Sequence, residues 1–123
     1  DVKMKDTKLG VIESRFADLI WENEPITTAQ LIKLCEQEFD WKRTTTYTVL
    51  KRLSNRGIFS STDGVVTSLI SRDEFYAHQS KNYVEDSFGG SLPAFFAAFT
   101  SGVKLTEKEV DEIQKMIDSY KEK

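Results

Sequence analysis

One hairpin pattern interrupts a chain whose other segments have helical periodicity, and it restricts the fold more than any other feature. Two short runs rich in β-branched and hydroxyl-bearing residues, 58–61 and 65–70, are joined through Thr62-Asp63-Gly64. Asp-Gly favours a tight turn between antiparallel strands, because both central residues of such a turn need a positive φ. The sequence therefore predicts a small β-hairpin in a mainly α-helical protein.

The first helical segment is indicated by apolar residues that recur every three or four positions. Asp6 or Thr7 is its candidate N-cap, and the run Asn23-Glu24-Pro25 ends it. We expect its apolar positions to face the core. These positions are Leu9, Ile12, Phe16, Leu19 and Ile20.

A second helix is predicted over residues 28–39, because Thr27-Thr28-Ala29-Gln30 fits the capping box that begins many helices. Cys35 lies on the apolar face of this helix, so a buried and inert thiol is favoured over a reactive one. The chain has one cysteine and one histidine, His78, which excludes a Cys/His zinc cluster within one chain. We expect neither a metal nor a cofactor.

A third helix is predicted over residues 41–55. It ends at Arg56-Gly57, where glycine suits the left-handed position after a helix. Three helices followed by a hairpin form a winged helix-turn-helix, in which the third helix enters the major groove of DNA and the hairpin lies along the neighbouring backbone. We therefore expect a winged-helix DNA-binding domain over residues 1–70.

The charge distribution supports this interpretation, although the net charge of the chain is −3. Residues 41–62 include five basic residues and no acid, as a phosphate-facing surface requires. The simpler alternative is a solvated helix face. The residues that we expect to contact DNA are Lys42, Arg43, Thr44, Thr45, Tyr47, Thr48, Lys51 and Arg52.

Residues 71–123 predict three further helices, at 71–88, 91–100 and 106–120, and capping boxes begin the first and the last. This tail holds eight of the fourteen aromatic residues, more apolar surface than so short a segment buries within itself. We expect it to form a helical dimerisation region; the alternative is that it folds back on its own winged helix. The expected interface residues are Phe95, Phe96, Phe99, Val110, Ile113, Met116, Ile117 and Tyr120.

These blocks resemble the penicillinase repressor family, which includes BlaI, MecI and the copper-responsive CopY. The segments LGVIE (9–13) and LIW (19–21) resemble the opening helix of that family. The segment WKRTTTYTVLKRL (41–53), continuing through Arg56-Gly57-Ile58, is similar to its recognition-helix signature, roughly W-S-x-K-T-V-x-T-x-L-x-R-L-x-K-K-G. In the tail, GGS (89–91) begins a Phe-rich helix and LTEKE (105–109) begins the last one.

The resemblance, which is to the BlaI and MecI branch, implies a homodimeric transcriptional repressor that binds a dyad-symmetric operator in front of resistance genes. It also implies induction by proteolysis. In the family a membrane sensor with a zinc protease domain detects β-lactam, and the repressor is then cut in its dimerisation segment. Alignment of the tail motifs places the cut bond of this chain between Ala98 and Phe99.

The chain departs from the family pattern at several positions. Lys42 replaces the serine before the recognition helix, so we expect the helix cap to come from Asp40 or Thr44. Thr44 also stands where the family usually has lysine, and Ala98 where it often has asparagine. The wing, residues 64–68, lacks the usual arginine and tyrosine. The paired cysteines of the copper-sensing branch are absent, which excludes a copper sensor.

The alternatives to a repressor of this kind are an enzyme, a protein-interaction module and a repressor that responds to a small ligand. An enzyme is not expected, because one histidine and one cysteine at unrelated positions provide no nucleophile and base. A winged helix used for protein contacts would need an apolar face where residues 44–52 are polar and basic. A repressor of the same build that responds to a small ligand stays open, since a pocket cannot be identified from sequence.

The sequence also bears on the location of the protein. The charged residues 1–6 lack the apolar core of a signal peptide. The longest largely apolar run, residues 92–99, is far too short to span a membrane. We therefore expect a cytoplasmic protein.

Overall fold

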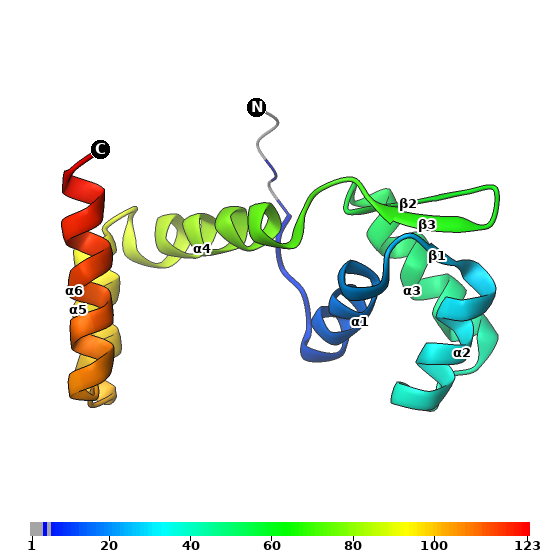
Figure 1. Cartoon of the computed structure of the whole chain (residues 1–123), viewed down its shortest axis with the longest axis horizontal. Coiled ribbons are helices and arrows are strands. Elements are labelled where there is room, and N and C mark those ends of the chain that lie inside the picture. Colours follow the sequence, from blue (N-terminus) through cyan, green and yellow to red (C-terminus); the bar gives the residue numbers. More distant parts are fainter. Residues whose placement is uncertain (1–3, 5) are drawn as a thin grey trace. The chain divides into compact units, whose positions relative to one another are not determined.

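Helices make up most of the chain, and three short strands form one antiparallel sheet (Figure 1). The computed structural model describes residue 4 and residues 6–123, so most of the charged opening segment discussed above lies outside the described residues. The chain divides into two compact units, Asp1–Asn82 and Tyr83–Lys123. The elements are α1 (Val11–Asn23), β1 (Ile26–Thr27), α2 (Thr28–Phe39), α3 (Arg43–Asn55), β2 (Phe59–Thr62), β3 (Val65–Ser68), α4 (Arg72–Phe88), α5 (Leu92–Gly102) and α6 (Glu107–Lys121).

The predicted hairpin is confirmed. Strands β2 and β3 pair antiparallel, and Asp63 and Gly64 between them both have positive φ, 52° and 74°. The sheet also has a strand that the sequence analysis missed, because β1 pairs with the other side of β3 through Ile26 and Val66. A strand of two residues is too short to show alternation, so the pattern gave no signal for it.

The helix boundaries test the capping predictions. The capping box of α2 is confirmed: the Thr27 hydroxyl accepts from the Gln30 amide at 3.1 Å, and the Gln30 side chain accepts from the Thr27 amide at 3.0 Å. The prediction that Asp6 or Thr7 caps the first helix is wrong, because α1 begins at Val11 with Gly10 as its N-cap. Asp6 and Thr7 are instead held by contacts with distant helices.

The predicted cap of α3 is also wrong. Lys42 is the N-cap residue, and its side chain makes no capping hydrogen bond. Asp40 ends α2 in the left-handed conformation, with φ 55°, and Thr44 lies inside the first turn of α3. A side chain caps a helix from the N-cap position, and Asp40 precedes that position by two residues while Thr44 follows it by two.

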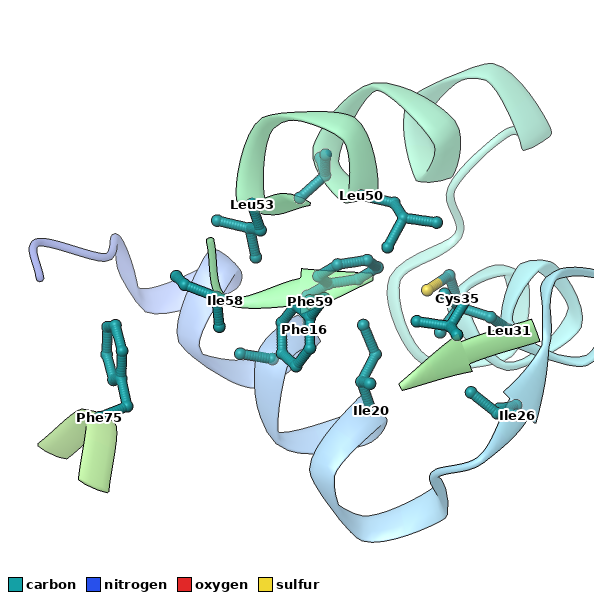
Figure 2. Packing of buried hydrophobic residues seen from close by; sticks show 13 residues of the cluster. Phe16, Ile20, Ile26, Leu31, Cys35, Leu50, Leu53, Ile58, Phe59 and Phe75 are labelled. Carbon is teal, nitrogen blue, oxygen red and sulfur yellow. The ribbon is translucent and has the colours of Figure 1, made fainter. Parts of the chain in front are cut away.

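The core of the first unit joins α1, α2, α3, the sheet and the beginning of α4 (Figure 2). Phe16 and Ile20 are fully buried, as predicted, and Cys35 is a buried free thiol whose pKa is raised by that burial. Ile12 is 44% exposed, which contradicts its predicted inward position. The first turn of α1 has no buried residue, so the helical spacing of its apolar residues does not show there which side chains pack in the core.

Two aromatic residues of the tail belong to this core. Phe75 of α4 is fully buried, and its ring centroid lies 5.7 Å from that of Trp21. Tyr76 packs against the same Trp21 at 5.9 Å. For these two residues the alternative prediction, packing on the winged helix, is the one observed.

The second unit has the predicted helices with slightly different bounds. Gly89 and Gly90 separate α4 from α5 and have positive φ, 57° and 82°. Helix α5 then runs to Gly102, past its predicted end, and α6 begins with the predicted capping box at Thr106. None of the helices in the described part of the chain combines the length and the hydropathy of a membrane span.

Candidate nucleic-acid interface

The exposed side of α3 is the surface that the sequence predicts to contact DNA. The inward side of the helix is formed by Thr46, Val49, Leu50 and Leu53. Residues three or four positions apart share a helix face, so the centre of the opposite face follows from this burial. It consists of the exposed residues Thr44, Thr48, Lys51 and Asn55. Hydroxyl, amide and ammonium groups of this kind recognise base edges and phosphates.

The side chains of this face are arranged by local contacts. The Thr48 hydroxyl donates to the Thr44 carbonyl oxygen at 2.9 Å, so it keeps its lone pairs as acceptors for a base amino group. Tyr47 is 42% exposed, and the Arg43 guanidinium lies 5.6 Å from its ring centroid. This cation–π contact holds a cation and a planar ring together at the start of the helix. Thr45 is half-buried and contributes less surface.

The beginning of α3 has positive charge and no side-chain cap. Lys42 and Arg43 are both exposed there. The amino end of a helix carries a partial positive charge, which these two cations reinforce. The arrangement suits a phosphate oxygen of a DNA backbone.

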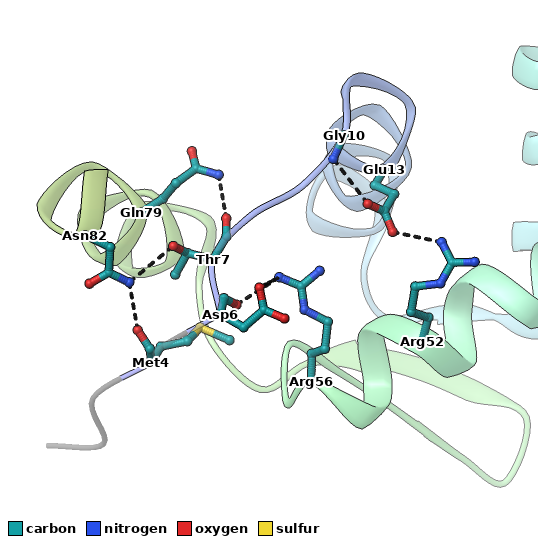
Figure 3. Close-up of polar contacts among 9 residues, drawn as sticks. All are labelled: Met4, Asp6, Thr7, Gly10, Glu13, Arg52, Arg56, Gln79 and Asn82. Carbon is teal, nitrogen blue, oxygen red and sulfur yellow. Dashed lines mark hydrogen bonds and ion pairs between the residues drawn. The ribbon is translucent and has the colours of Figure 1, made fainter. Parts of the chain in front are cut away.

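Two of the five basic residues of the 41–62 stretch are bound to carboxylates (Figure 3). Arg52 Nη1 lies 3.0 Å from Glu13 Oε2, and Arg56 Nη2 lies 3.0 Å from Asp6 Oδ1. The basic residues of this stretch that form no ion pair with a described residue are Lys42, Arg43 and Lys51. Arg52 was predicted to contact DNA, and the structure places it on an intramolecular acid.

Glu13 has two functions in this arrangement. Its Oε1 accepts from the Gly10 amide at 3.1 Å, which caps α1, and its Oε2 accepts from Arg52 of α3. Both bonds favour the charged form, the one from Gly10 more strongly, so they lower the pKa of the Glu13 carboxyl. The carboxylate therefore stays ionised beside Arg52 at neutral pH.

The wing has a different character. Its turn residues Thr62, Asp63 and Gly64 are exposed, and residues 57–71 include no Lys or Arg. The Ser60 and Thr62 hydroxyls lie 3.2 Å apart on β2. Asp63 at the tip repels phosphate, so any contact of this wing with a DNA backbone depends on hydroxyl and amide donors.

The residues predicted to form a dimer interface lie in the second unit, and most of them are exposed. Phe95 and Ile113 are half-buried, and the rings of Phe88 and Phe95 meet edge to face at 5.6 Å. The exposed ones are Phe96, Phe99, Val110, Met116, Ile117 and Tyr120. Ala98 and Phe99, the predicted cleavage residues, are both exposed on α5.

Sequence reasoning missed the acidic partners of the arginines and the amide at the end of α3. Glu13 and Arg52 are 39 residues apart, and Asp6 and Arg56 are 50 apart, so no local pattern connects them. Asn55 lies four residues after Lys51 and seven after Thr48, so the helical spacing of the sequence was enough to place it on the same face. Among the described residues there is no cluster of three or more His, Cys, Asp or Glu that could hold a metal ion.

The fold is a winged helix followed by a helical C-terminal segment. A profile of the penicillinase repressor family matches residues 9–119, and the chain belongs to this family of transcriptional repressors. It is similar to the methicillin resistance regulatory protein MecI of Staphylococcus aureus, with 20% identity over 118 residues that cover 93% of this chain and 96% of that protein.

Proposed function

We propose that this repressor acts as a homodimer on a dyad-symmetric operator, with α3 of each subunit in the major groove. The support for the DNA surface is the exposed face of α3, where Thr44, Thr48 and Asn55 offer hydrogen-bonding groups beside Lys51. Tyr47 presents a ring at the edge of this face, suited to a thymine methyl group. Lys42 and Arg43 provide the phosphate contacts at the start of the helix.

The observation that carries the dimer is the lack of burial in the second unit. Neither α5 nor α6 has a buried residue in the single chain, although α5 is mostly apolar. On α6, Val110, Met116 and Ile117 are each about half exposed or more. Packing two such units together removes these surfaces from water, which is the main driving force of association. We therefore assign residues 1–70 to DNA binding and the tail, residues 71–123, to dimerisation, with the contacts between subunits made by the part of the tail beyond Asn82.

Repression ends, on this proposal, when a membrane sensor-protease that responds to β-lactam cuts the bond between Ala98 and Phe99. The name of the MecI relative, a methicillin resistance regulatory protein, supports the link to β-lactam resistance. Helix α5 is short, has no buried residue and follows two glycines with positive φ. A helix of this kind opens locally at low free energy, as a protease cleft requires.

Cleavage at this bond separates α6 from the winged helix. We call the winged helix of one subunit, residues 1–70, a head. Two heads joined by one dimerisation region bind two half-sites together, and this linkage raises the affinity for the operator by a factor of about 10²–10⁴. After the cut each head binds its half-site alone. The DNA surface itself does not need to change.

The test begins with the purified full chain and a pool of randomised DNA duplexes. We expect selection to yield two half-sites related by two-fold symmetry, and sedimentation to report a dimer. Cells that carry the chain with its chromosomal neighbours are then induced with a β-lactam, and the repressor fragments are weighed by mass spectrometry. A fragment ending at Ala98 supports the proposal; intact repressor under full induction, or a cut within residues 1–70, contradicts this mode of release.

A further inference from the structure

Helix α4 is attached to the winged helix near its start and again one to two turns farther along the same face. Phe75, Gln79 and Asn82 are spaced four and three residues apart and therefore share this face. At the first place Phe75 is buried in the core, Tyr76 packs on Trp21, and Arg72 Nε donates to Asp18 Oδ1 at 3.0 Å. At the second, the Gln79 side-chain amide donates to the Thr7 carbonyl oxygen at 2.7 Å, and the Asn82 amide donates to the Met4 carbonyl oxygen at 3.0 Å (Figure 3).

The partner of these amides is a segment near the start of the chain, residues 4, 6 and 7, which we call the N-terminal strap. Thr7 is only 3% exposed, and its hydroxyl accepts a further bond from Asn82 at 3.2 Å. A buried carbonyl group without a partner is unfavourable, so the amides of α4 hold the strap in place. Met4 packs against the core beside it.

The strap is bound on its other side by α3. Arg56 Nη2, just after the end of that helix, donates to the Asp6 carbonyl oxygen at 2.8 Å and to its carboxylate at 3.0 Å. The Arg56 side chain is only 16% exposed. The strap therefore connects the helix that is predicted to read DNA with the helix that leads out of the winged helix.

The second attachment restricts a motion that the first allows. A helix fixed only at its first turn is able to change its tilt, since apolar contacts are not directional and the ion pair of Arg72 with Asp18 is exposed, its side chains being 54% and 32% accessible. Asn82 lies about 10 Å farther along the axis, at about 1.5 Å per residue, so bonds there oppose any change in tilt. Hydrogen bonds from a planar amide also have a preferred direction. Helix α4 continues without a break beyond Asn82 to Phe88 and so enters the second unit.

We infer that Gln79 and Asn82 are positioning residues, which fix the direction of α4 against α3 through the N-terminal strap and thereby set the half-site spacing that the repressor accepts. The inference rests on the proposed dimeric binding, because spacing matters only when two heads are joined. If α4 is held rigidly against the winged helix in both subunits, the dimer binds half-sites at one separation along the DNA. If α4 is able to tilt, the dimer binds half-sites at several separations.

The test compares the full chain with a double variant, Gln79→Met and Asn82→Leu, which removes both donors and keeps side chains of similar size that favour a helix. The matched control is Ser80→Ala. Ser80 is exposed on the same helix, and its hydroxyl donates only to the Ala77 carbonyl of its own turn. The probes are the duplex selected by the unmodified chain, the same duplex with the spacer changed by one to five base pairs, and a duplex with one half-site.

We expect the unmodified chain and Ser80→Ala to prefer the selected spacing strongly. The double variant should lose about tenfold or more of that preference, within the range that linkage supplies, while its affinity for the single half-site is unchanged. Thr7→Val removes only the hydroxyl bond to Asn82, so it should relax the preference in the same direction by less. This milder variant serves if the double variant does not fold.

The inference is overturned if these variants keep the spacing preference of the control, because Phe75 and its neighbours then set the direction of α4 alone. It is also overturned if single half-site affinity falls as much as operator affinity, since the bonds then merely stabilise the winged helix. A selected site without two-fold symmetry is a different outcome. That result contradicts the proposed dimeric function and removes the basis of the inference with it.

Discussion

Replacing Glu13 by glutamine tests whether the ion pair with Glu13 prevents Arg52 from contacting a DNA phosphate. The side chain of Arg52 is 54% exposed and that of Glu13 22%, so their ion pair is largely solvated. Such a pair contributes about 0.2–1 kcal/mol to the free energy of unfolding. The amide oxygen of a glutamine still accepts from the Gly10 amide, which preserves the start of α1. We therefore expect Glu13→Gln to lower stability by less than about 1 kcal/mol.

The effect on DNA binding should be larger and of opposite sign. Arg52 freed from Glu13 is able to neutralise a phosphate, and each phosphate contact steepens the dependence of log K on log salt by about 0.9. Two heads in a dimer give a change of about 1.8. Glu13→Gln should thus bind a random duplex more tightly at low salt and lose that advantage as salt rises.

The assay is fluorescence anisotropy with a labelled random duplex across a series of salt concentrations. Arg52→Gln and the double variant Glu13→Gln with Arg52→Gln are the controls, because neither has the cation that the first variant releases. Both should show no steepening relative to the unmodified chain. If Glu13→Gln has the same salt slope as the unmodified chain, Arg52 does not reach the backbone and the reasoning is refuted.

Three further predictions concern the contacts of α3 with DNA bases, the dimer interface and the dependence of stability on pH. Tyr47→Ala or Thr48→Ala should weaken binding to the selected operator by about 1–3 kcal/mol and binding to random DNA little, in mobility shifts; equal losses on both would remove their base-reading role. The double variant Ile113→Asp with Ile117→Asp should give monomers in light scattering, because the two substitutions place charge in the proposed dimer interface of α6. A double variant that stays dimeric with intact operator affinity would place the interface elsewhere. Since the pKa of Glu13 is lowered on folding, its stabilising contribution should be complete above its ordinary value of 4.5 and be lost as the pH falls through the lowered value. Thermal unfolding should therefore separate the unmodified chain from Glu13→Gln at pH 6 and not at strongly acidic pH.

Local signals in the sequence predicted the elements of the fold except β1, because a cap or a turn depends on residues that are neighbours in the chain. The capping residues Thr27 and Thr106 begin helices as expected, and Asp63-Gly64 forms the hairpin turn. The failures arose where a residue of the right type is used for something else. Asp40 ends one helix instead of beginning the next, and Thr7 is buried beneath α4 instead of capping α1.

The contacts that orient the candidate site were beyond this kind of reasoning. The bond from Asn82 to Met4 joins residues 78 apart, and the pair of Arg52 with Glu13 joins two helices that sequence reasoning placed only by their own patterns. Composition showed that the tail is too apolar for its length. It did not show that Phe75 and Tyr76 complete the winged-helix core, because an apolar residue on a helix has no preferred partner in the sequence.

The electrostatics of the first unit bear on how release by cleavage works in the proposed mechanism. Two of the five basic residues of the 41–62 stretch are held by Glu13 and Asp6, and Asp63 places an acid at the tip of the wing, so this surface keeps three cations without an ion pair to a described residue. Sequence-independent affinity depends on the number of phosphates neutralised, and few cations therefore mean weak binding by one head. A head that binds weakly alone depends on its linkage to the second head for occupancy of the operator. On the proposed mechanism a cut in α5 is then enough to release the DNA, whereas a strongly basic winged helix would stay bound after the same cut and the genes would remain repressed.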